Sequence, residues 1–146
     1  MPPAKLIVEL VPQSTWGWNL RSELRPSEWD RLRKATYARA GHKCEVCGGR
    51  GRKHPVECHE RWEYDDVNHV QKLVGLEALC PPCHKTKHFG FAVQVGLAHV
   101  SRAHLMKVND WSGDTADDHI SQSFDQWRKR SNVTWTLDLT WLKDFR

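Results

Sequence analysis

The chain has 146 residues, of which 39% are hydrophobic and 27% are charged, and its formal net charge at pH 7 is +4. This composition excludes disorder of the whole chain, and the length fits a single domain. The apolar runs fall far short of the roughly 20 residues that a membrane span needs, and Pro12 interrupts the N-terminal segment before a secretion signal can form. We therefore expect a cytoplasmic protein with no membrane partner.

The basic residues are unevenly distributed along the chain. Residues 21–56 hold ten Lys and Arg against four Asp and Glu, a local charge of +6, whereas residues 110–146 hold five against seven. A concentrated basic segment is typical of a surface that meets a polyanion, although it also occurs on an ordinary solvated helix face. Charge alone therefore does not decide between these two interpretations.

The first half of the chain contains two regular elements by its pattern. Residues 5–11 form a short β-rich run that Pro12 ends. A helix is predicted from Ser27, because Ser27 and Asp30 have the spacing of a capping box, and Gly41 would end it. This helix leads directly to Cys44.

The pattern continues with shorter elements and then long helices. Residues 54–61 alternate as a strand does, residues 65–72 are typical of an irregular link or short helix, and residues 82–88 begin a helix that Gly90 would end or break. Helical spacing then covers residues 91–108 and 114–130. Residues 133–141 alternate with period two and predict a last strand, with Trp135 and Trp141 on the core face.

The cysteines form two pairs with the spacing of a metal site. Cys44 and Cys47 make one C-x2-C pair, Cys80 and Cys83 make another, and Cys58 stands alone. Two such pairs are typical of a structural zinc ion held by four thiolates. The reducing cytoplasm would keep these thiols free for the metal.

Three of the nine histidines lie where they can share a second metal ion. His84 and His88 are four residues apart on the predicted helix, so they project from the same face. His59, in the predicted strand before them, can complete a three-histidine site. Such a site leaves coordination positions for water and phosphate oxygens, as metal-assisted hydrolysis requires.

These motifs together resemble those of the HNH endonucleases, the ββα-metal or His-Me finger nucleases, in their zinc-stapled form. The resemblance covers residues 44–90 and depends on the two cysteine pairs, on the run Glu57-Cys58-His59-Glu60 and on the spacing of His84 and His88. It implies a β-hairpin followed by a helix, and metal-dependent hydrolysis of phosphodiester bonds in DNA.

The resemblance assigns roles to particular residues. His59, His84 and His88 match the ligands of a catalytic divalent ion (Mg²⁺, Mn²⁺, Ni²⁺ or Zn²⁺), and Glu60 stands at the general-base position, where the family usually has histidine. In an alternative register His59 is the base and Cys58 the ligand.

Other positions near the finger are open to more than one interpretation. The family's asparagine is expected at Gly75, while Asn68 lies nearby but out of register, and His69 is a second candidate base. Trp62 and Tyr64 are candidates for the walls of the site. Trp16 and Trp18 are candidates for stacking on an extruded base. Contacts to the DNA backbone are expected from the basic residues beside the metal motifs: Arg50, Arg52, Lys53, Lys85 and Lys87.

The predicted fold class is α+β, with a small ββα-metal finger and its four-cysteine structural zinc embedded between terminal helices and short terminal strands. We expect a single domain, 1–146, with an N-terminal strand and basic helix (1–43), the finger (44–90) and a helical extension that ends in a strand (91–146). Three functions fit: a metal-dependent DNA endonuclease, a decayed zinc-stapled DNA-binding module, and an interaction protein with a purely structural zinc. The oligomeric state is open, with a homodimer as one alternative.

Overall fold

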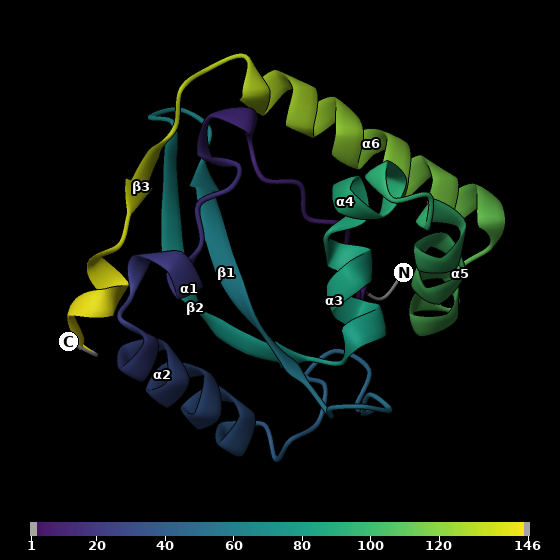
Figure 1. Ribbon diagram of the computed structural model, residues 1–146. Coiled ribbons are helices and arrows are strands. Elements are labelled where there is room, and N and C mark those ends of the chain that lie inside the picture. Colours follow the sequence, from purple (N-terminus) through teal and green to yellow (C-terminus); the bar gives the residue numbers. More distant parts are fainter. Residues whose placement is uncertain (1–2, 145–146) are drawn as a thin grey trace.

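The computed structural model describes residues 3–144, and within them it has an α+β fold (Figure 1). A long hairpin of β1 (Glu57–Asp65) and β2 (Val70–Leu79) forms most of a three-stranded sheet, in which β3 (Thr136–Asp138) runs parallel to the start of β2. Helices come before and after this hairpin in the chain. Within residues 3–144, three helices precede it: η1 (Gln13–Thr15), α1 (Leu20–Glu23) and α2 (Pro26–Arg39). Five follow it in the same range: α3 (Pro81–Lys87), α4 (Phe89–Gln94), α5 (Ala98–Asn109), α6 (Gly113–Ser131) and η2 (Thr140–Asp144). The predicted fold class is confirmed.

The two faces of the hairpin bury two separate apolar clusters. The cluster on the α2 side contains six buried leucines: Leu20, Leu24, Leu32, Leu73, Leu76 and Leu142. The cluster on the α3 side contains Leu6, Val8, Cys44, Leu79, Cys80, Cys83, Phe89, Leu105 and Ala116. A bulge in β2 opposite Arg61 and Trp62 adds one residue, and this brings Leu73 and Leu76 to the same face. The hairpin therefore separates the two apolar clusters.

The predicted link over residues 65–72 is a hairpin turn. Asp65 accepts hydrogen bonds from the backbone N–H groups of Val67 and Asn68 at 3.0 Å, and His69 has a φ of 57°, so the chain reverses within residues 66–69. Strand β2 then begins at Val70. The predicted link, 65–72, was longer than the turn, which takes up only half of that segment.

The predicted strand over residues 5–11 is wrong, since this segment pairs with no strand among residues 3–144. As in a strand, alternate side chains of this segment face inward and outward, with Leu6 and Val8 buried and Ile7 exposed. Its backbone, however, bonds to side chains: Asn109 Oδ1 accepts the Leu6 N–H at 3.0 Å, and His119 Nε2 accepts the Val8 N–H at 3.0 Å. We call residues 5–11 the N-terminal strap.

Two further predictions are corrected in the second half of the chain. Gly90 does not end the helical region, because α4 contains it, and Gly96, with a φ of 76°, separates α4 from α5 instead. The predicted last strand, 133–141, has only three residues in β3 before the chain turns into η2. The predicted start of the first helix is also corrected: α2 begins at Pro26, and its capping pair is Arg25 with Glu28, which accepts the Arg25 N–H at 3.2 Å, in place of Ser27 with Asp30.

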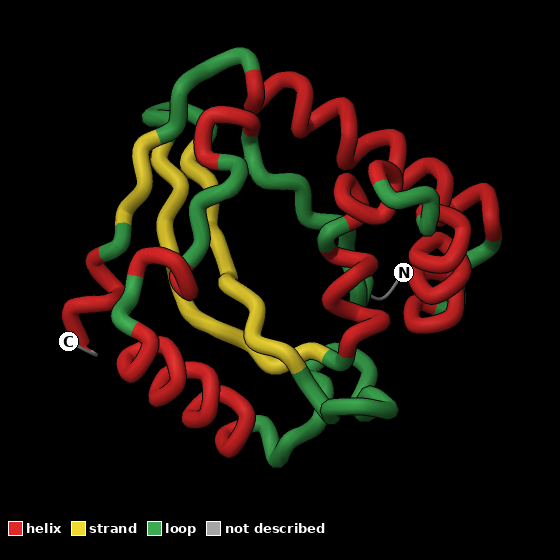
Figure 2. The backbone as a smooth tube through the Cα atoms, viewed as in Figure 1, coloured by secondary structure: helices red, strands yellow, loops and turns green. Residues whose placement is uncertain are grey.

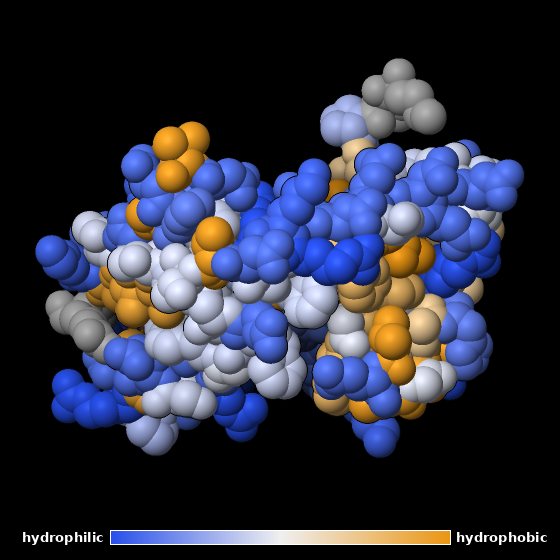
Figure 3. All heavy atoms as spheres, turned by 90° about the horizontal axis from the view of Figure 1, so that it is seen from above, coloured by the Kyte–Doolittle hydropathy of each residue, from blue (hydrophilic) through white to orange (hydrophobic). Residues whose placement is uncertain are grey.

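The C-terminal helices add an exposed apolar surface to the molecule. Figure 3 shows apolar residues gathered on the side that carries α4 and α5, where five side chains are exposed: Phe91, Val93, Val95, Leu97 and Val100. Among residues 3–144, no helix combines the length and the apolar character needed to cross a membrane.

Candidate active site and metal centres

The four paired cysteines meet at one point, as their spacing predicts. Cys44 and Cys47 lie in the irregular segment between α2 and β1 (Figure 2), Cys80 directly follows β2, and Cys83 lies in α3. Their sulfur atoms all lie within 4.8 Å of one another, and none forms a disulfide. Cys47 Sγ and Cys80 Sγ are 3.6 Å apart, close to the roughly 3.8 Å between thiolates that share a tetrahedral zinc ion. The cluster could hold zinc.

The electrostatics of this cluster favour a cation. A hydrogen bond from Cys83 lowers the pKa of Cys44 to about 4, and the same bond raises the pKa of Cys83. Burial raises the pKa of Cys80 to about 11. One thiolate is therefore stabilised by its neighbouring thiols, and a divalent ion would be needed to keep all four ionised. In addition, Cys83 Sγ lies 3.2 Å from His104 Nε2 on α5.

The three predicted histidines also come together. His59 projects from β1 toward α3, and His84 and His88 lie in α3 and at its C-terminal end. One ring nitrogen from each lies within 4.8 Å of the others. The Nε2 atoms of His84 and His88 are 3.1 Å apart, close to the roughly 3.3 Å between two imidazole nitrogens on a tetrahedral ion. We call this trio the histidine centre.

The charge state of the histidine centre suits metal binding. Burial lowers the pKa of His84, and burial together with the neighbouring histidines lowers that of His88 to about 4. His84 Nδ1 lies 3.1 Å from Glu57 Oε1. A carboxylate can only accept, so Nδ1 carries the proton and the Nε2 lone pair faces His88. Burial opposes the ionisation of Glu57, but bonds from His54 and His84 lower its pKa below the usual value.

Glu60, the predicted general base, is already bound to another element. Its Oε1 accepts the Leu20 N–H at the start of α1, at 2.7 Å. Burial raises the pKa of Glu60. Consecutive strand residues point to opposite faces, so Glu60 and His59 leave β1 on different sides, although both line the same groove.

The alternative register, with Cys58 as a ligand, finds no geometric support. Cys58 packs against the leucine cluster on the α2 side, and burial raises its pKa to about 12. Among residues 3–144, Cys58 belongs neither to the group of four paired cysteines nor to the histidine centre. Cys58 is therefore an ordinary half-buried thiol.

Gly75, Asn68 and His69 bring no ligand or base to the histidine centre, whereas Trp62 and Tyr64 line the groove over it. Gly75 is buried in β2 and opposite Arg61, and a Cβ there would meet no atom within 4 Å. Asn68 bonds to Asp65 in the hairpin turn. His69 lies in the same turn against Trp135, about 20 Å along the strand from His59.

The predicted contact of Lys87 with DNA is wrong. Lys87 is only 5% exposed, and its Nζ lies 2.9 Å from Glu9 and 3.2 Å from Glu77. A buried lysine with two partly buried acidic partners is not free to reach a phosphate. The other predicted contacts are exposed: Arg50, Arg52, Lys53 and Lys85.

A groove of about 940 Å³ runs over the histidine centre. Trp16, Trp18 and Trp62 line it, Trp16 is 66% exposed, and Trp18 packs edge-on against Trp62 with ring centroids 5.6 Å apart. Arg21 and Arg33, from α1 and α2, add positive charge. No protein-family model, curated protein or solved structure matches this chain.

Sequence reasoning missed two acidic residues at the histidine centre. Glu57 lies two residues before His59, so both side chains leave β1 on the same face, and this period-two spacing could have identified it. Glu9 lies 2.8 Å from His59 but 50 positions away in the chain, and no local signal points to it.

Proposed function

We propose that the protein is a metal-dependent endonuclease that hydrolyses phosphodiester bonds in DNA. The observation that carries this proposal is the histidine centre, in which the Nε2 atoms of His84 and His88 are 3.1 Å apart and Glu57 fixes the His84 tautomer. The centre opens into a groove, and exposed basic side chains lie on the neighbouring loop and helix.

The histidine centre suits phosphate chemistry because it offers three ligands to an ion and leaves other coordination positions open. Three histidines fill only part of the coordination shell of Mg²⁺, Mn²⁺, Ni²⁺ or Zn²⁺, so a bound ion would supply Lewis-acid stabilisation to the phosphate and to the leaving 3′ oxygen. In this proposal Glu60 accepts the proton of the attacking water, and His59, His84 and His88 are the catalytic ligands. Both Glu60 and the histidines line the groove.

We also propose that the four paired cysteines hold a structural zinc ion. The support is the 3.6 Å separation of Cys47 Sγ and Cys80 Sγ and the hydrogen bonding that lowers the pKa of Cys44. A zinc ion there would join the segment before β1 to the start of α3, and so fix the helix that carries two of the histidines.

DNA is the proposed partner because exposed side chains on the segment before β1 and on α3 are basic. Arg50, Arg52 and Lys53 lie on the loop before β1, and Lys85 lies on α3, all exposed. Such side chains bind phosphates without reading sequence. The exposed Trp16 at the groove offers a stacking surface for a base.

A second candidate function, a DNA-binding module without catalysis, is favoured by one observation. The Glu60 carboxylate is held by the Leu20 N–H at 2.7 Å, and Gly75 brings no side chain to the site. If Glu60 serves only to cap α1, the groove binds DNA but no residue activates water.

The test is a plasmid-nicking assay with Mg²⁺, Mn²⁺, Ni²⁺ or EDTA, run on protein whose zinc content has been verified. The parent is compared with His84→Ala, Glu60→Gln and a control, His99→Ala, at an exposed position on α5. Cutting that needs metal and is lost in the first two variants supports the nuclease with Glu60 as base. Loss in His84→Ala alone moves the base elsewhere, and DNA binding without any cutting favours the binding module.

A further inference from the structure

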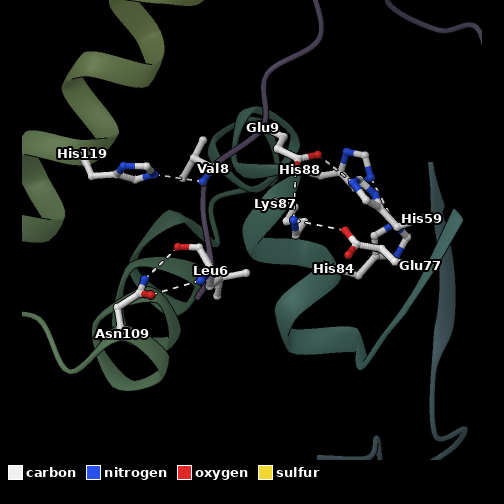
Figure 4. Close-up of polar contacts among 10 residues, drawn as sticks. All are labelled: Leu6, Val8, Glu9, His59, Glu77, His84, Lys87, His88, Asn109 and His119. Atoms are coloured by element: carbon white, nitrogen blue, oxygen red, sulfur yellow. Dashed lines mark hydrogen bonds and ion pairs between the residues drawn. The ribbon is translucent and has the colours of Figure 1, made fainter. Parts of the chain in front are cut away.

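The N-terminal strap passes between α3 on one side and α5 and α6 on the other (Figure 4). The Glu9 N–H donates to the Lys87 carbonyl of α3 at 2.9 Å. On the other side, Asn109 of α5 bonds to both backbone groups of Leu6, and His119 of α6 accepts the Val8 N–H. The helical extension therefore fixes the backbone on both sides of Glu9.

The Glu9 side chain points from this strap into the histidine centre (Figure 4). Its Oε2 lies 2.8 Å from His59 Nε2, and its Oε1 lies 2.9 Å from Lys87 Nζ. His59 is only 5% exposed, whereas the Glu9 side chain is 31% exposed. Lys87 also pairs with Glu77 at 3.2 Å. The ammonium group of Lys87 already supplies the cation between Glu9 and Glu77, so these two acids and His59 are not themselves a metal site.

Given the metal centre proposed above, we propose that Glu9 is a positioning residue for His59. An ionised carboxylate has no proton to give, so the 2.8 Å contact places the proton on His59 Nε2 and leaves the lone pair on Nδ1. The ring then presents Nδ1 to the ion. Glu57 does the same for His84 from the opposite nitrogen. Each of these two ligands thus has its own carboxylate, an arrangement that orients the ring and raises its basicity.

The strap and the helices behind it thereby take part in the site. Lys87 keeps the second oxygen of Glu9 occupied, so the carboxylate cannot turn away from His59. Asn109 and His119 hold the strap, which otherwise has no strand partner among residues 3–144. Helices α5 and α6 would then hold in place a residue of the metal centre.

The experiment measures metal binding and not cleavage. Protein carrying one zinc ion per chain is titrated with a second equivalent of Zn²⁺ by calorimetry, for the parent, Glu9→Gln and the control Glu77→Gln, which removes the same charge from the same lysine. We expect Glu9→Gln to weaken the second site by about 10–100-fold, while Glu77→Gln leaves it nearly unchanged. Urea unfolding of each variant checks that all three are folded.

A second readout separates positioning from a purely structural role. Long-range ¹H–¹⁵N spectra of the zinc-loaded parent should show His59 with its proton on Nε2, and Glu9→Gln should weaken that preference. Unchanged affinity in Glu9→Gln, a deprotonated His59 Nε2, or no second zinc ion in the parent would each overturn the inference. Because none of these readouts needs DNA, a protein that binds the second ion but does not cut would refute the nuclease and leave the role of Glu9 standing.

Discussion

Asn109→Ala should destabilise the protein far more than its place on a surface helix indicates. Asn109 Oδ1 accepts the N–H groups of Lys5 and Leu6 at 2.8 and 3.0 Å, and its Nδ2 donates to the carbonyls of Leu6 and Leu105 at 2.8 and 3.1 Å. Water can replace the exposed bond to Lys5. The three partly buried bonds contribute about 0.5–1.5 kcal/mol each, so we expect a loss of about 2–4 kcal/mol in the free energy of unfolding.

The assay is equilibrium unfolding in urea with zinc present, and Asn132→Ala, at the exposed end of α6, is the matched control. That control should change stability by less than about 0.5 kcal/mol. Asn109→Asp should fall between the two, because it keeps the acceptor and loses both donated bonds. If Asn109→Ala costs no more than the control, the strap is not held by this side chain and the account of its backbone is wrong.

Three further predictions test separate parts of the molecule. Burial lowers the pKa of His119, whose Nε2 accepts the Val8 N–H only when unprotonated. The stability that His119 contributes is complete above about pH 6.5, the pKa of histidine in the unfolded chain, and should be lost as the pH falls below it. His119→Gln should therefore reduce the pH dependence of urea unfolding. With zinc bound, a thiol reagent should react with almost no cysteine at neutral pH, since burial raises the pKa of Cys58 to about 12. Removal of zinc by a chelator should make the four paired thiols reactive. Fast reaction of the zinc-loaded protein would contradict the proposal that these four cysteines hold zinc. Reversing Arg50 and Arg52 to Glu should weaken DNA binding and flatten its dependence on salt, whereas reversal of the exposed Arg128 on α6 should not; equal slopes would place the DNA elsewhere.

The parts of the site that sequence predicts are those fixed by short-range spacing. The C-x2-C pairs bring sulfur atoms together within one turn, and residues four apart on a helix share a face, so Cys80, Cys83, His84 and His88 could be assigned from their positions alone. These features depend on neighbours in the chain and not on the rest of the fold. Alternation predicted one strand, 54–61, which overlaps β1, but it did not predict β2, and the hairpin itself was expected only from the family resemblance.

The parts that sequence does not predict depend on contacts between distant segments. Residues 5–11 are β-rich, and Leu6 and Val8 are buried as alternate residues of a strand would be, but this composition cannot say whether a strand or side chains satisfy the backbone. Likewise, the sequence around Lys87 does not show that this lysine is buried and pairs with Glu9 and Glu77. Glu9 and His59 meet only because α5 and α6 fix the strap, and no local pattern contains that information.

The two proposed metal centres are joined through α3, and the dependence between them runs in one direction. Helix α3 has seven residues, too few for an isolated helix to be stable in water. Its start is fixed by Cys80 and Cys83 of the cysteine cluster, and the next turn carries His84 and His88. Loss of the cysteine cluster would therefore release both histidines from their shared face. Loss of a histidine removes no contact of the cysteine cluster, so the cluster would keep its zinc when the histidine centre is disrupted.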